Sequence, residues 1–307
     1  MSATTAEPAP VRGVAATGGV RVRKTADAIA TVVLWAMASS IIVMLAAFII
    51  YIGYLGWSAL TPSFIFGVPK ETTAGGGIGP EIYNSFYILI LTLLFTTPIA
   101  VAAGVFLQEY ARPGGFRSIV QFSAESLATV PSVVMGLFGL LVFVYTFHWK
   151  YTALGGALTL TVLNLPALLR VTQEALSSVP DSLREASMAL GGTKWQTITR
   201  VVLPSAIGRL TTGIVLIAGR IFGETAALIF TAGLSVTANK PYDLNPFHTA
   251  ETLAVHLWYT HSESVVPDVD RIGNGSALVL LIMVLAFNVG ARLIGRALTK
   301  RFTGRSS

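Results

Sequence analysis

The sequence of 307 residues contains no cysteine. Disulfide cross-links and thiolate metal sites are therefore excluded, and cysteine usage gives no information about the redox compartment. Charge is also scarce, because Asp, Glu, Lys and Arg make up only 12% of the residues, against about 25% in soluble domains. Hydrophobic residues make up 53%. So little charge beside so much apolar surface predicts a membrane protein.

No glycine in the chain is followed directly by lysine. The phosphate-binding loop of nucleotide-hydrolysing proteins requires that pair after a glycine-rich stretch. The glycine run at residues 75–77 is therefore interpreted as a flexible hinge that leads into a membrane span. We expect no nucleotide site, no catalytic residue and no cofactor in this chain.

Uncharged stretches predict six membrane spans, because a helix needs roughly 20 apolar residues to cross the hydrocarbon core. The expected spans cover residues 28–51, 82–108, 126–149, 151–169, 210–239 and 272–291. The fifth stretch is interrupted by Arg220 and Glu224, and prolines within the second to fourth spans predict kinks. We therefore expect an all-α polytopic membrane protein with six transmembrane helices.

Lysine and arginine gather on one side of these spans. The loops on the other side contain only Lys70, Lys150, Lys240 and Arg271. Positive residues favour the cytoplasm, so both termini are expected there. The net charge of +6 is thus a topology signal, and it gives no support to a role in nucleic-acid binding. Residues 1–27 are expected to form a disordered cytoplasmic tail, followed by the first span and by an external loop at 52–81.

A second external segment is expected at residues 233–271. Asn245 as the cap and Pro246 at the first helical position predict the start of a helix. His248, His256 and His261 match no spacing of metal ligands, and without cysteine partners they are interpreted as surface histidines. No metal site is expected.

Residues 178–204 read SVPDSLREASMALGGTKWQTITRVVLP and predict two short helices on the cytoplasmic side. Pro180 favours a first helical turn, Gly191 ends that helix, and Thr193 begins a capping box for the next one. Pro204 is expected to end the second helix or to bend it into the fifth span. Periodicity alone is compatible with a docking element and with an ordinary re-entry loop.

The spacing within this segment resembles the signature of ABC importer permeases, E-A-A-x(3)-G-x(9)-I-x-L-P. Ser replaces the second Ala and Val replaces Ile, and both departures are mild. The resemblance implies the binding-protein-dependent, type I (MetI-like) permease fold over residues 82–297, with a cytoplasmic coupling loop at 176–203 and a tail at 298–307. In that family the loop docks into an ATPase subunit. The implied coupling residues are Glu185, Ala186, Ser187, Gly191, Leu203 and Pro204.

Five stretches resemble the phosphate-importer branch of this family, the PstA permeases. They are GGGIGPEIYNSFYILILT, GVFLQEYA, LATVPSVVMGLFGL, LREASMALGGTKWQTITRVVLP and GRIFGETAALIFTAG. The resemblance implies a PstC-like sister permease, a PstB-like ATPase dimer that binds ATP and Mg²⁺, and a PstS-like phosphate-binding protein outside a bacterial plasma membrane. A sulfate or molybdate importer permease, a secondary transporter or channel, and a membrane scaffold or sensor are the alternatives.

Arg220 and Glu224 lie one helical turn apart within the fifth span. On a continuous helix they share a stripe of polar and small residues with Thr231. A charge at the bilayer centre costs roughly 2.5–3.5 kcal/mol, and such residues usually face a bundle interior or water. We therefore expect these three residues to line a substrate pathway, where the Arg220 guanidinium attracts an anion and Glu224 orients it. A purely structural ion pair is the alternative.

Overall fold

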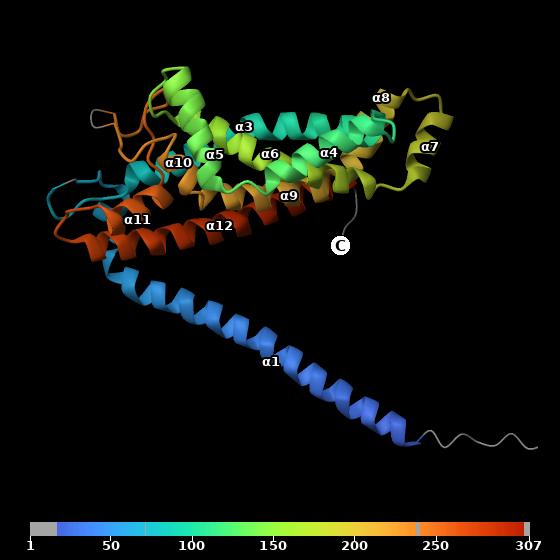
Figure 1. Ribbon diagram of the computed structural model, residues 1–307, viewed down its shortest axis with the longest axis horizontal. Helices are drawn as coiled ribbons and strands as arrows, with labels where there is room; N and C mark the ends of the chain where they lie inside the picture. The colour runs from blue at the N-terminus through green and yellow to red at the C-terminus, as the bar shows by residue number, and fades with distance from the viewer. Residues whose placement is uncertain (1–16, 71, 238–239, 304–307) are drawn as a thin grey trace, which may run out of the picture. The chain divides into compact units, whose positions relative to one another are not determined.

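The computed structural model describes residues 17–70, 72–237 and 240–303, which form helices joined by loops (Figure 1). Three of the helical segments, η2, η3 and η4, are π-helical. In chain order the elements are α1 (Thr17–Gly56), η1 (Trp57–Ala59), α2 (Pro62–Phe66), α3 (Gly79–Val105), η2 (Phe106–Tyr110), α4 (Gly115–Ala128), α5 (Ser132–Gly139), η3 (Leu140–Thr146), α6 (Ala153–Ser177), α7 (Asp181–Ala189), α8 (Lys194–Thr197), η4 (Ile198–Val202), α9 (Leu203–Phe222), α10 (Ala226–Ile229), α11 (Leu253–Ser262) and α12 (Val269–Thr303).

The first of two bodies, Met1–Tyr54, consists of most of α1. This helix begins at Thr17, so the expectation of a disordered tail is wrong for residues 17–27, because the helix propagates back from the apolar run. Residues 1–16 lie outside the described residues. Its apolar run is long enough to cross a membrane.

In the second body, Leu55–Ser307, the helices α3, α6, α9 and α12 run side by side (Figure 1). Their facing surfaces form one apolar core, which includes Ile88 of α3, Leu160 of α6 and Ile217 of α9. Glycine allows the closest approach of α6 and α9. A Cβ atom at Gly213 would clash with Cγ1 of Val171, so a larger residue there would force Val171 or the helices to shift.

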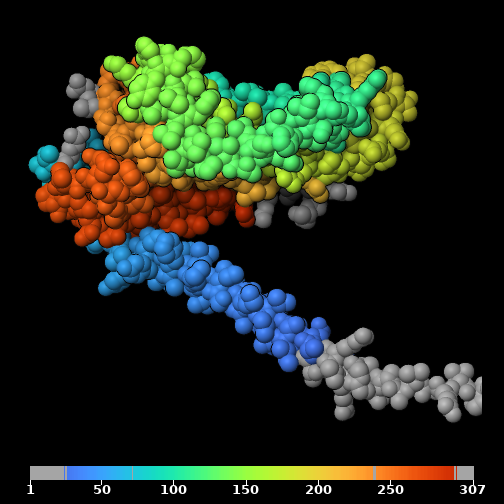
Figure 2. Space-filling view, in the orientation of Figure 1, coloured from blue at the N-terminus to red at the C-terminus, as the bar shows by residue number. Residues whose placement is uncertain are grey.

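Five helical stretches of the described chain are long and apolar enough to cross a membrane. They are Ala26–Ala59, Gly79–Tyr110, Ala153–Ser177, Lys194–Phe222 and Val269–Leu293. A sixth span exists only if the bent pair Gly115–Ala128 and Ser132–Thr146 is counted as one. The expectation of one continuous span over 126–149 is wrong, because the chain bends by 99° between these helices, where Pro131 interrupts the helical hydrogen bonds. Figure 2 shows α4 and α5 covering one face of the bundle.

The fifth span also differs from its expected range of 210–239. Helix continues from Lys194 through the π-helical η4 into α9 and ends at Phe222. Pro204 therefore does not end the helix; it lies inside the continuous helical stretch, directly after the π-helical η4. The segments α7 and α8 lie at one end of the bundle, and α10 and α11 lie at the other (Figure 1).

The helix of the external segment begins at Leu253 with Thr252 as its cap, so the expected start at Asn245 is wrong. Asp243 accepts a hydrogen bond from the N–H of Asn245, and Asn245 accepts one from the N–H of Phe247. These side-chain bonds close a turn in place of a helical turn.

Candidate functional site

The segment expected to couple to an ATPase has the predicted helix–glycine–helix form. α7 ends before Gly191, whose φ of +85° is a left-handed conformation that favours glycine. The predicted capping box at Thr193 is present, and its side chain accepts a hydrogen bond from the N–H of Gln196. Ser187 adds a contact that its alanine counterpart in the signature could not make, since its hydroxyl lies 2.9 Å from that of Thr197.

The signature residues divide into an exposed part and a packed part. Glu185, Ala186 and Gly191 are exposed, whereas Leu203 and Pro204 are half-buried at the start of α9. Large apolar side chains surround the exposed part and are themselves exposed, with Leu190 at 90% and Trp195 at 63%. An apolar patch of this kind at the end of a bundle is typical of a docking surface.

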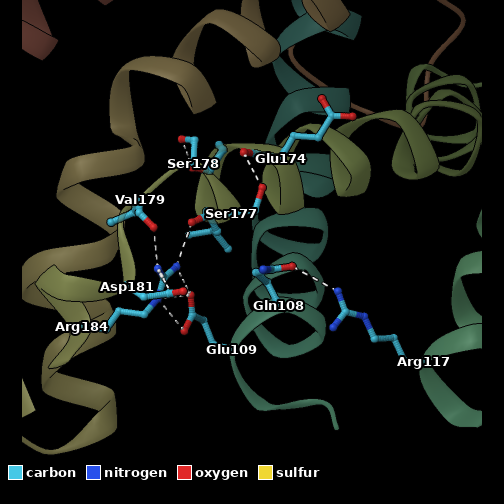
Figure 3. Close-up of polar contacts among 11 residues, drawn as sticks. Gln108, Glu109, Arg117, Glu174, Ser177, Ser178, Val179, Asp181 and Arg184 are labelled. Carbon is cyan, nitrogen blue, oxygen red and sulfur yellow. Dashed lines mark hydrogen bonds and ion pairs between the residues drawn. The ribbon is translucent and has the colours of Figure 1, made fainter. Parts of the chain in front are cut away.

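Arg184 fastens α7 to the bundle, as Figure 3 shows. Its guanidinium donates to both carboxylate oxygens of Glu109 in η2, with the shortest distance at 2.8 Å. It also donates to the carbonyl oxygens of Leu176 and Val179, at 2.8 and 2.6 Å. The carbonyl of Leu176 lies in the last turn of α6, and that of Val179 lies just beyond the end of this helix. The one side chain therefore joins α7 to the ends of two membrane helices.

The sequence interpretation missed Arg184 and Glu109, although both lie within stretches already singled out for their resemblance. Arg184 precedes the signature glutamate, and Glu109 lies in GVFLQEYA. Their separation of 75 residues follows no local period, so only the packing of η2 against α6 brings them together.

The structure does not bring Arg220 and Glu224 into the expected ion pair. Arg220 is exposed in the last turn of α9, where the helix dipole favours a cation. The helix ends two residues later, so the geometry of a continuous helix is lost. Glu224 instead accepts a hydrogen bond from the N–H of Ala227, at 3.4 Å, in the first turn of α10. Among the described residues, no ion pair joins the two side chains.

Thr231 is buried and is not on a shared stripe with Arg220. Its hydroxyl donates to the carbonyl of Ala227, and its own carbonyl accepts from the N–H of Thr152. A Cβ atom at Gly139 would lie 2.7 Å from its methyl group, so Thr231 packs the segment that follows α10 tightly against α5. The geometry assigns Thr231 a packing contact and leaves Arg220 and Glu224 at the break between α9 and α10.

The expectation of surface histidines is wrong for His256, which is 8% exposed. It packs beside Glu81 of α3 and Glu251, both buried, because the start of α11 lies against the first turns of α3. His261 is exposed, and His248 is half-buried beside Asp243.

Known proteins resemble this chain in sequence. Residues 96–304 match the family model described as binding-protein-dependent transport system inner membrane component. A probable ABC transporter permease protein, YqgI of Bacillus subtilis, is 44% identical over 290 residues, covering 92% of this chain and 99% of that protein. Phosphate transport system permease protein PstA 1 of Mycobacterium tuberculosis (strain H37Rv) is 34% identical over 255 residues, covering 80% of each.

Solved structures share the fold. A bacterial ABC transporter involved in the import of the acidic polysaccharide alginate contains a chain with a TM-score of 0.66 and 17% identity, covering 91% of this chain and 100% of that one. A chain of the MetNI methionine ABC transporter in an inward-facing conformation has a TM-score of 0.56 and 20% identity, covering 73% of this chain and 94% of that one. At these identities the likeness concerns the fold alone.

Proposed function

The chain belongs to the ABC importer permeases, the inner membrane components of binding-protein-dependent transport systems, and on that premise we propose that it conducts inorganic phosphate into the cell. The observation that supports phosphate is the likeness to PstA permeases at 34% identity, together with Arg220 within the GRIFGETAALIFTAG stretch. Its immediate partners would be a PstC-like permease, a PstB-like ATPase dimer and a PstS-like phosphate-binding protein.

Arg220 would attract the anion within the pathway between the two permeases. A guanidinium matches a phosphate oxyanion with paired donors and keeps its charge at any physiological pH. Arg220 is exposed on this chain, so its charge is available to a pathway formed with a second subunit. Residues 223–225 break the helix between α9 and α10. Non-helical backbone is tolerated within a membrane where it is buried in protein or lines water, and this supports a pathway beside the break.

Glu224 would fix this break, because its carboxylate holds the N–H of Ala227. Phosphate would then meet one positive charge, and it would not be held tightly. Conduction requires binding that is weak enough for the ion to leave.

The exposed part of the α7–α8 segment would dock into the ATPase. Arg184 would transmit the movement of that docking to the ends of α6 and η2. The chain itself would hold no catalytic residue and no cofactor, and ATP and Mg²⁺ would bind to the partner subunit.

The test is phosphate uptake by the complete complex in liposomes, with both permeases and the ATPase present. The binding protein is added on the side of the membrane that carries the external face of the permeases. Wild type should accumulate radiolabelled phosphate only with ATP. Arg220→Gln should assemble normally and lose most uptake, whereas Arg209→Gln, an exposed arginine of the same helix, should retain it.

The outcome separates the candidate substrates. Uptake competed by unlabelled phosphate, and not by sulfate or molybdate, supports the proposal. Competition by sulfate or molybdate alone would replace phosphate with that oxyanion. Equal uptake by the two arginine variants would remove Arg220 from the pathway.

A further inference from the structure

A buried cluster of three ionisable side chains lies at the end of the bundle that carries α11, away from the coupling segment. Glu81 belongs to the first turn of α3, Glu251 directly precedes the cap of α11, and His256 belongs to α11. Their exposures are 0%, 4% and 8%. One potential ligand atom from each residue lies within 4.8 Å of the other two. The proposed transport of phosphate uses none of these residues.

Neighbouring hydrogen bonds fix the segments that carry the cluster. The Asn84 amide donates to the carbonyl of Glu251 at 3.1 Å, and the Ser85 hydroxyl accepts from the N–H of Leu253 at 2.9 Å. Both residues lie within one turn of Glu81 on α3. The three side chains are therefore held together by the fold itself, which is the preorganisation that a ligand site needs.

The cluster leaves buried polar atoms without partners. Neither carboxylate oxygen of Glu81 nor Nε2 of His256 has a hydrogen-bond partner, although all three atoms are buried. An unpartnered buried carboxylate is costly unless it is paired or coordinates a metal. His256 Nδ1 lies 3.9 Å from Oε1 of Glu81, which is too far for a hydrogen bond. A buried carboxylate in a fixed site without a hydrogen bond therefore points to a group that binds there.

A divalent cation suits the charge of these groups. Two carboxylates and one neutral imidazole carry two negative charges, and a divalent cation balances them within a buried site.

We propose that Glu81, Glu251 and His256 bind one divalent cation of the first transition series, with Zn²⁺ or Mn²⁺ as the best match. Imidazole suits zinc, and carboxylates suit manganese. Nδ1 of His256 lies 3.1 Å from Oε1 of Glu251 and 3.9 Å from Oε1 of Glu81. Ligands at about 2.1 Å from a shared ion lie about 3.0–3.4 Å apart, so small side-chain movements complete the site.

The cation would fasten the external segment to the start of α3. Glu251 and His256 also line a cavity of about 800 Å³, whose other lining residues include Lys70, Thr237 and Tyr259. Three protein ligands leave coordination positions open, and water within this cavity can fill them. The inference concerns a site separate from Arg220 and does not depend on which anion the permease carries.

The experiment measures Zn²⁺ binding to the purified complex that contains the full chain, isolated without a polyhistidine tag and treated with a chelator. Equilibrium dialysis followed by elemental analysis should find one zinc ion per chain that the same complex with Glu81→Gln or His256→Gln lacks. Matched controls are Glu263→Gln and His261→Gln, which change exposed residues at the end of the same α11 helix and should keep the ion.

Equal zinc in the Glu81→Gln variant and in its Glu263→Gln control would overturn the proposal, as would weak binding of several ions that no variant changes. If the cluster variants fail to assemble, wild type carries the test. Zinc added after chelation should then raise its thermal unfolding midpoint, because a ligand that binds only the folded state stabilises it. An unchanged midpoint would refute the site.

Discussion

Replacing Arg184 should detach α7 from the bundle and weaken association with the ATPase. The Arg184→Ala change removes the guanidinium that bonds Glu109 and the carbonyls of Leu176 and Val179. It leaves a carboxylate of 8% exposure without its cation. No residue of α7 is fully buried, so α7 lacks a large apolar anchor to replace this contact.

The magnitude follows from the burial of the pair. Breaking a buried ion pair by removing one partner costs about 3–5 kcal/mol. Arg184 is 14% exposed, so water reaches the site in part, and we expect the lower end, about 3 kcal/mol. On the scale of soluble domains of 150–250 residues, this corresponds to a fall of roughly 6–12 °C in the unfolding midpoint.

Arg170 offers a matched control at the same end of the bundle. It pairs with Glu174 at 3.1 Å, but the two side chains are 75% and 67% exposed. Exposed pairs contribute about 0–1 kcal/mol. Thermal unfolding of the solubilised chain and co-purification of the ATPase should therefore separate Arg184→Ala from Arg170→Ala.

A double-mutant cycle tests the pair itself. Glu109→Gln should cost less than Arg184→Ala, because Arg184 keeps its carbonyl acceptors and its bond to Asp181. The two changes together should cost less than their sum, since each removes the same contact. Additive costs, or equal shifts for Arg184→Ala and Arg170→Ala, would refute the anchoring role.

Three further changes test other parts of the molecule. Gly191→Asp, at φ +85°, should cost no more than about 1 kcal/mol locally, since aspartate tolerates the left-handed conformation better than most residues. It should reduce ATPase co-purification and uptake, and normal uptake would remove this turn from coupling. A cysteine at Ser262 should react with an impermeant thiol reagent in intact cells. A cysteine at Ser306, which lies outside the described residues, should react only after lysis. External labelling of both cysteines would refute the expected topology. The N–H of Asn245 donates to Asp243 and holds the pKa of that carboxyl below its usual value. The ionised Asp243 side chain therefore stabilises the folded chain above about pH 4, and this stabilisation is lost as pH falls through the lower pKa of the folded state. With Asp243→Asn, the unfolding midpoint should fall less steeply as the pH is lowered, and an unchanged pH dependence would refute this role of Asp243.

Local chemistry determined what the sequence could predict correctly. Apolar runs identified the long helices, since their composition alone meets the requirement of a membrane span. The turn at Gly191 and the capping box at Thr193 followed from backbone preferences that act within four residues. The spacing from Glu185 to Pro204 identified the permease family, because the whole signature lies within one continuous segment of the chain.

Tertiary structure decided the features that depend on distant parts of the chain. The end of α9 at Phe222 was missed because the stretch stays largely apolar on both sides of it. The Phe222 ring packs between Phe86 and Phe287, and the chain then turns to place α10 against α5. Arg184 meets Glu109 across 75 residues, and His256 meets Glu81 across two helices, with no period that relates either pair. Periodicity gives the face of one helix, but only packing determines which charges share a buried space.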